Sequence, residues 1–194
     1  MTSITLSRDL YISIFKKTLF LLLVFSATTL FAQVEESTTS TKNSDFTFVP
    51  KNSVPNGRKF KRKIYRYEEK ERLSYAWSPY PENIEASYRY TRPGTGGIYA
   101  ANSAKTALAE VTYWKVDLNR RKLIKKRIHL EKVLDLTRKR IRKKLGVTRE
   151  EITQNDYELP QAIGDWAIEN GFDGIRFPSA RNPKGWNIVG FKGL

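Results

Sequence analysis

The chain has 194 residues, of which 35 are lysine or arginine and 20 are aspartate or glutamate, so its formal net charge is +15. A hydrophobic content of 40% is enough for a packed core and excludes a wholly disordered chain. The absence of cysteine excludes disulfides and cysteine nucleophiles, and the single histidine, His129, excludes multi-histidine metal sites. Any chemistry must therefore use carboxylates, hydroxyls, guanidiniums and the backbone.

The N-terminal residues have the pattern of an export signal. Lys16 and Lys17 precede the uncharged run 18–32, which is shorter than the roughly 20 apolar residues that span a bilayer. A basic flank, an apolar core and a small residue at its end, Ala32, predict a signal peptide over residues 1–33. We therefore expect an exported protein, periplasmic or secreted, cleaved near Ala32. An uncleaved membrane anchor is the alternative.

The residues after this signal divide into a linker and one domain. Segment 34–57 is rich in Ser, Thr, Asn and Pro, which predicts a flexible linker because such residues bury little apolar surface. The remaining residues, 58–194, have the length of a single domain.

The positive charge is concentrated in the stretch 115–144, which holds fourteen Lys or Arg residues and three acids. Such a stretch could bind nucleic acid or another anionic surface. Trp114 is the one aromatic residue beside it, so it lacks the interleaved aromatics that stack on single-stranded bases. This argues against nucleic acid as a partner and favours a solvated face or a surface for an acidic partner.

The domain reads as a mixture of strands and helices. Residues 97–101 predict a strand, and Ser103 is a candidate cap for a helix in which Ala104, Ala107, Leu108 and Val111 form an apolar stripe beside Glu110. Residues 122–136 predict one or two strands with charged outer faces, on which we expect His129 to be exposed and to have no role.

The C-terminal third continues this pattern. Thr148 and Glu151 have the spacing of a capping box, a helix is expected over 160–170 with Gly171 as its stop, and 174–177 and 186–191 are strand-like. The order of elements predicts an α+β domain rather than a doubly wound parallel sheet.

Two segments resemble a known family. YRYTRPGTGGIYAANSAKTALAEV (88–111) and DWAIENGFDGIRFPSARNPKGWNIVGF (165–191) resemble the RES domain, and the resemblance extends over about residues 64–193. It implies an ADP-ribosyltransferase-like fold, a mixed sheet core with flanking helices, that binds NAD+ as its substrate without a metal. Family members are toxins of bacterial toxin–antitoxin pairs. They destroy NAD+ by phosphorolysis or hydrolysis, or transfer ADP-ribose to a protein acceptor.

The resemblance also implies the site residues. It places Arg89, Glu110 and Ser179 in the catalytic set, and Tyr99, Arg66 and Asn187 among the residues that bind NAD+. The family often has glycine before the arginine and Asn or His two residues after it, whereas this chain has Tyr88 and Thr91. Arg66 resembles an early family arginine, so the choice between Arg66 and Arg89 stays open. The partner that the family implies is an antitoxin or immunity protein, which the charge of this chain predicts to be acidic.

These residue types suit cleavage of the nicotinamide–ribose bond. The leaving group is neutral and the ribose develops oxocarbenium charge, so a carboxylate such as Glu110 can stabilise the transition state. A guanidinium binds pyrophosphate oxygens in a bidentate manner, Tyr99 offers a flat face to the nicotinamide ring, and Ser179 can donate a neutral hydrogen bond. The alternative function is an exported basic binding module for nucleic acid or anionic surfaces with a degenerate pocket. That module would depend on the lysines and on salt, whereas the enzyme would depend on Glu110.

Overall fold

The structure is a computed structural model, and it describes residues 47–194. The predicted signal peptide, 1–33, and residues 34–46 of the predicted linker lie outside the described residues. Within 47–194, no helix combines the length and the apolar character needed to cross a membrane.

The described residues form a closed five-stranded sheet flanked by short helices, as expected for an α+β domain. The elements, in chain order, are β1 (Arg58–Glu69), the 3-10 helix η1 (Lys70–Tyr75), α2 (Pro81–Glu85), β2 (Ile98–Ala101), α3 (Ala104–Tyr113), the 3-10 helix η2 (Leu118–Arg120), β3 (Arg121–Asp135), α4 (Lys139–Leu145), α5 (Arg149–Thr153), α6 (Glu158–Glu169), β4 (Gly174–Pro178) and β5 (Trp186–Gly190). The strands close in the order β1-β2-β5-β4-β3. All neighbours are antiparallel except β3 and β4, which are parallel.

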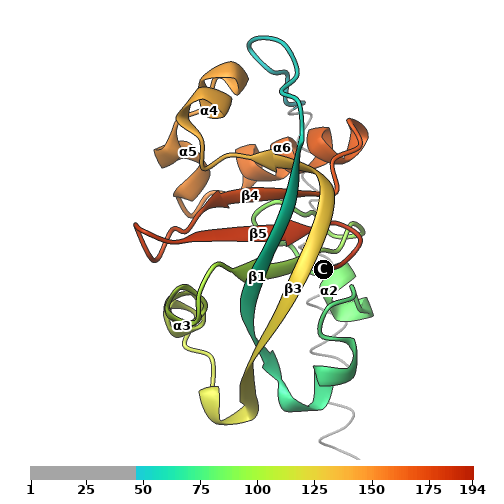
Figure 1. Cartoon of the computed structure of the whole chain (residues 1–194), viewed down its shortest axis with the longest axis vertical. Coiled ribbons are helices and arrows are strands. Elements are labelled where there is room, and N and C mark those ends of the chain that lie inside the picture. Colours follow the sequence, from blue (N-terminus) through green and yellow to red (C-terminus); the bar gives the residue numbers. More distant parts are fainter. Residues whose placement is uncertain (1–46) are drawn as a thin grey trace, which may run out of the picture. The chain divides into compact units, whose positions relative to one another are not determined.

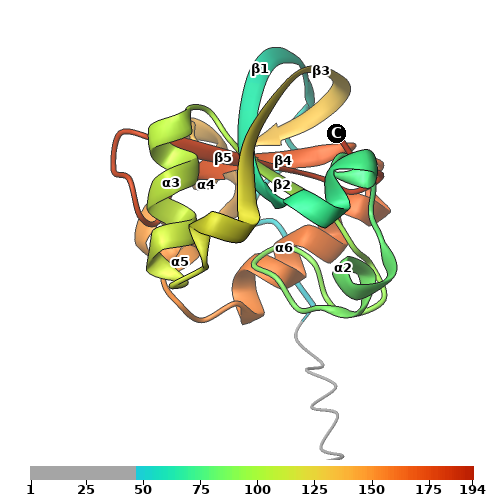
Figure 2. The same cartoon turned by 90° about the horizontal axis from the view of Figure 1, so that it is seen from below.

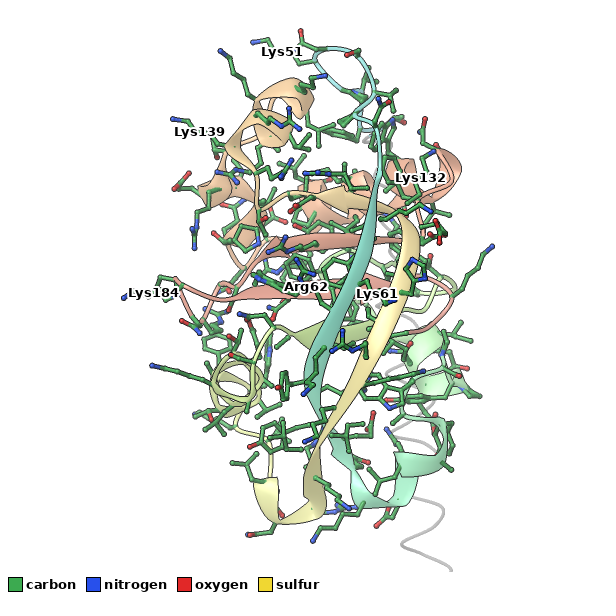
Figure 3. All side chains as sticks on the ribbon, in the orientation of Figure 1. Lys51, Lys61, Arg62, Lys132, Lys139 and Lys184 are labelled. Carbon is green, nitrogen blue, oxygen red and sulfur yellow. The ribbon has the colours of Figure 1, made fainter. Side chains whose placement is uncertain are left out.

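β1 and β3 pair over most of their length and form a long twisted ribbon in front of β4 and β5 (Figure 1). One face of the ribbon contributes Phe60, Ile64 and Ile128 to the core. The other face is strongly basic, and Lys63 lies directly opposite Arg127 across the strands. Figure 3 shows the labelled Lys61 and Arg62 on this ribbon. The predicted charged outer face of 122–136 is confirmed, and all of the segment except Leu136 belongs to the single strand β3.

Strand β1 has no counterpart among the predicted elements. Its two core residues, Phe60 and Ile64, are four positions apart, and charged residues occupy all three positions between them. A spacing of four suits both a helix face and alternate positions of a strand, so the apolar pattern cannot decide between them. Residues 58–69 form a strand because they pair with β3.

The predicted helices form, with adjustments at their exposed faces. Ser103 caps α3 by accepting a hydrogen bond from the Thr106 backbone N–H, and Thr148 and Glu151 form the capping box of α5. The predicted apolar stripe of α3 is wrong at Leu108, which is 40% exposed, because α3 presents the face with Thr106 and Ala107 to the domain instead.

Two apolar clusters lie on opposite sides of β4 and β5. One lies toward the ribbon and contains Phe60, Ile64, Ala100, Ile128, Val133 and Ile188. The larger cluster is formed with α4, α5 and α6, and includes Leu134, Ile163, Trp166, Ile175, Phe177 and Val189. Figure 2 shows α6 and the ribbon on opposite sides of β4 and β5, with α3 at one flank.

The larger cluster also contains Phe48, from the segment for which the sequence predicted a linker. Phe48 is buried and meets Trp166 edge-on, with 5.9 Å between the ring centroids. The backbone N–H of Asn52 donates to the Lys144 carbonyl, 3.1 Å away. The described end of that segment therefore packs on the domain.

We predict that Phe48→Ala destabilises the full chain by about 3–5 kcal/mol, because it leaves a cavity beside Trp166. The matched control, Val49→Ala, removes a side chain from a residue that is 76% exposed and should change stability by less than about 0.5 kcal/mol. Urea unfolding measures both. Equal stability of the two variants would show that Phe48 does not anchor the segment.

Candidate active site

A cavity of about 510 Å³ opens between β1, β2, α3 and the ends of β4 and β5. Five of the six predicted site residues line it: Arg66, Arg89, Tyr99, Glu110 and Asn187. The sixth, Ser179, is buried behind Glu110 and contacts it directly. The fold thus gathers residues from β1, the loop before β2, β2, α3, the loop after β4, and β5 around one space.

Glu110, in the last turn of α3, is the carboxylate at the centre of this group. Its Oε1 accepts hydrogen bonds from Ser179 Oγ and Asn187 Nδ2, each at 2.7 Å. Glu110 lines the cavity, and among residues 47–194 both side-chain donors act on Oε1, so Oε2 has no hydrogen-bond donor there. The two donors hold the carboxylate in one orientation.

The Ser179 hydroxyl is fully used within the protein. It accepts hydrogen bonds from the backbone N–H groups of Arg181 (3.1 Å) and Asn182 (2.9 Å), and it donates its proton to Glu110. A hydroxyl has one proton and two lone pairs, so none remains for a ligand. The structure therefore supports a role for Ser179 in orienting Glu110 and not in contacting substrate.

Asn187 lies on β5 and reaches the same carboxylate from the other side. Its amide N–H₂ donates to Glu110, whereas its Oδ1 is buried without a hydrogen-bond partner among residues 47–194. Burying an amide oxygen without a partner costs free energy, so such an atom beside a cavity points to a missing donor from a ligand or a water.

Tyr99, on β2, presents its ring to the cavity and its hydroxyl to the protein. The hydroxyl accepts a hydrogen bond from the Tyr90 backbone N–H at 2.9 Å and lies 3.3 Å from Thr91 Oγ1. Burial raises the pKa of Tyr99 above its ordinary value. Thr91, where the chain departs from the family pattern, thus helps to hold Tyr99, and Tyr88, the other departure, lines the cavity.

The two candidate arginines are held differently. Arg89 is tied to the end of α5: its Nη1 donates to the carbonyls of Ile152 (3.2 Å) and Gln154 (2.5 Å), and its guanidinium lies over the Tyr157 ring. Arg66, on β1, pairs with Glu68 through Nη2, while its Nε and Nη1 are buried without a partner among the described residues. Arg66 thus keeps two guanidinium donors that no group among residues 47–194 satisfies.

Sequence reasoning missed several residues that line the cavity. Glu68 is one, and its position two residues after Arg66 on a strand was the available signal, since alternate residues share a face. The others are mainly arginines and aromatics, including Arg72, Arg121, Arg181, Tyr80, Trp114 and Tyr157. No motif marked these because they come from η1, from β3 and from loops.

The cavity carries more positive than negative charge. Five arginines and two glutamates line it, and Arg72 and Arg121 share the carboxylate of Glu69. No group of three potential metal-binding side chains occurs within 47–194. The arrangement can bind an anionic ligand with aromatic rings and place one fixed carboxylate, Glu110, against a centre that develops positive charge.

Comparisons with known proteins agree with this geometry. The family model described as the RES domain matches residues 63–193. A probable NAD(+) phosphorylase of Mycobacterium tuberculosis is 36% identical over 102 residues, which are 49% of this chain and 48% of that protein. The match therefore spans about half the length of that relative.

A solved structure shares the fold. It is the crystal structure of the M. tuberculosis MbcT–MbcA toxin–antitoxin complex, in which the matching chain superposes with a TM-score of 0.58 at 22% identity. The match covers 71% of this chain and 77% of the other.

Proposed function

The chain belongs to the RES domain family, and on that premise we propose that it is an enzyme that cleaves the nicotinamide–ribose bond of NAD+. The observation that carries the proposal is the Glu110 carboxylate, held by Ser179 and Asn187 at the wall of an arginine-lined cavity. The relative described as a probable NAD(+) phosphorylase supports the same substrate.

The reaction requires electrostatics more than a protein nucleophile. When nicotinamide leaves, the ring nitrogen loses its positive charge and the ribose gains oxocarbenium character. Glu110 is already oriented before this charge develops, so its carboxylate stabilises the transition state without further reorganisation. Its Oε2 can also accept hydrogen bonds from the ribose hydroxyls.

The rest of the cavity suits the other parts of the dinucleotide. The Arg66 guanidinium lies at the wall of the cavity and can pair with diphosphate oxygens, and the Tyr99 ring faces the cavity beside Tyr88, with 5.5 Å between the ring centroids. Aromatic faces of this kind stack on flat heterocycles. The intact contacts of Glu110 favour the enzyme over a basic binding module with a degenerate pocket.

We further propose inorganic phosphate as the acceptor of ADP-ribose, on the strength of the phosphorylase relative. Water is the second candidate, and a protein side chain, as in an ADP-ribosyltransferase, is the third. The product distinguishes the three acceptors. Phosphate gives ADP-ribose 1-phosphate, water gives free ADP-ribose, and a protein side chain gives a modified protein.

Nicotinamide release by the full chain, with and without phosphate, tests the activity. We expect Glu110→Gln to lower kcat by about 10²–10³-fold, the loss typical of removing one preorganised electrostatic contact. The control, Glu169→Gln, changes an exposed glutamate of α6 and should keep full activity. Unchanged release by Glu110→Gln would refute the assignment.

We propose that an acidic antitoxin or immunity protein binds this chain. The net charge of +15 and the exposed basic faces of β3 and α4, with Lys139 among the side chains labelled in Figure 3, support this. A charge-driven complex should weaken at least several-fold between about 50 and 500 mM salt, as titration calorimetry can measure. A salt-independent affinity would contradict the charge argument.

Export is also a proposal, since its signal lies in residues outside the described structure. It would separate the toxin from the NAD+ of the cell that makes it. Cell fractionation followed by N-terminal sequencing should find the chain outside the cytoplasm and starting near Gln33. A full-length cytoplasmic chain would refute export.

A further inference from the structure

Glu68 is a second carboxylate in the wall of the cavity, and its side chain is only 2% exposed. Its Oε1 accepts the Glu69 backbone N–H at 2.9 Å, and its Oε2 forms an ion pair with Arg66 Nη2. Both oxygens are therefore engaged within the protein. This separates Glu68 from Glu110, whose Oε2 has no hydrogen-bond donor among residues 47–194.

The pair follows from strand geometry. Residues 66 and 68 are alternate positions of β1, so both side chains leave the same face and point to the same side of the ribbon. The backbone N–H of Glu69 fixes the carboxylate, and the carboxylate in turn fixes one end of the guanidinium. Because a guanidinium is planar, holding Nη2 also sets the plane in which Nε and Nη1 lie.

Stability does not account for this arrangement. Burying two charges is costly, and a buried ion pair is often no more stable than apolar residues of similar size. Arg66 in addition keeps two buried donors without a partner among residues 47–194. A costly ion pair in the wall of a cavity, with two guanidinium donors that no group of residues 47–194 meets, is expected where the guanidinium serves a ligand.

The other arginines that line the cavity are held by Glu69, which does not line it, or by neutral groups. Arg121 and Arg72 pair with Glu69, Arg89 donates to backbone carbonyls, and Arg181 donates to Asn155 and lies over the Tyr113 ring. Arg66 is the cavity arginine for which a buried carboxylate serves as the support.

We propose that Glu68 is a positioning residue, which orients the Arg66 guanidinium toward the diphosphate of the substrate. This rests on the proposed function, because it takes the ligand to be a dinucleotide. Glu68 itself does not touch the substrate in this assignment and acts only through Arg66.

Kinetics of Glu68→Gln test the proposal. Glutamine keeps the shape but loses the charge that holds Arg66. We expect KM for NAD+ to rise about 10- to 100-fold, the size of one charge-assisted hydrogen bond, with kcat changed by less than about threefold. The control Glu71→Gln removes an exposed carboxylate and should leave both constants unchanged. A lower kcat at unchanged KM would overturn the proposal.

A double-mutant cycle tests whether Glu68 acts on KM through Arg66. If Glu68 acts through Arg66, the double variant Arg66→Met with Glu68→Gln should have the same KM as Arg66→Met alone. Additive effects of the two changes would show that Glu68 acts independently of Arg66 and would overturn the proposal.

A binding measurement separates this inference from the proposed activity. Inorganic pyrophosphate should raise the melting temperature of the wild-type full chain, and Glu68→Gln should weaken its binding by the same 10- to 100-fold. If the wild type releases no nicotinamide, the proposed cleavage of NAD+ is refuted, but pyrophosphate binding still tests the role of Glu68. No effect of pyrophosphate on the wild type, or equal effects in both proteins, would overturn the proposal.

A second variant serves if Glu68→Gln does not fold. Glu68→Asp keeps the charge but shifts it by one methylene, and the same weakening of pyrophosphate binding is expected.

Discussion

The shared hydrogen bonds to Glu110 Oε1 are the contacts on which the site depends. They connect the last turn of α3 to the residue after β4, through Ser179, and to β5, through Asn187. Three elements must therefore be in register before the carboxylate has its orientation. The Ser179 hydroxyl is itself fixed by two backbone N–H groups of the following loop, so the orientation is set by backbone and not by a mobile side chain.

The ribbon of β1 and β3 serves two purposes with its two faces. Its outer face carries like charges directly opposite one another, as at Lys63 and Arg127, which costs stability in a sheet. Its inner face supplies apolar residues to the core and then, toward the end of β1, the pair Arg66 and Glu68. The same strand thus contributes both to packing and to the binding of an anion.

Much of the fold could be predicted from local signals. Ser103 and the Thr148–Glu151 capping box mark helix starts, and the runs at β2, β4 and β5 are short and apolar. β1 could not be predicted, because Phe60 and Ile64 fit two periodicities. Leu108 was placed wrongly because the apolar pattern of α3 does not show which face meets the sheet. In the site, Glu68 and Arg121 carry no motif, and the pairing of β1 with β3 brings both to the wall of one cavity.

The amino-acid sequence by itself determined the family, the α+β class and the types of residue available for chemistry, since these depend on composition and on motifs in order along the chain. Only the tertiary structure decided which groups meet. It placed Ser179 behind Glu110, tied Arg89 to the end of α5, and left Arg66 with two donors that have no partner within 47–194. The physical reason is that hydrogen-bond partners far apart in sequence, such as residues 110 and 187, are chosen by sheet closure and not by local propensity.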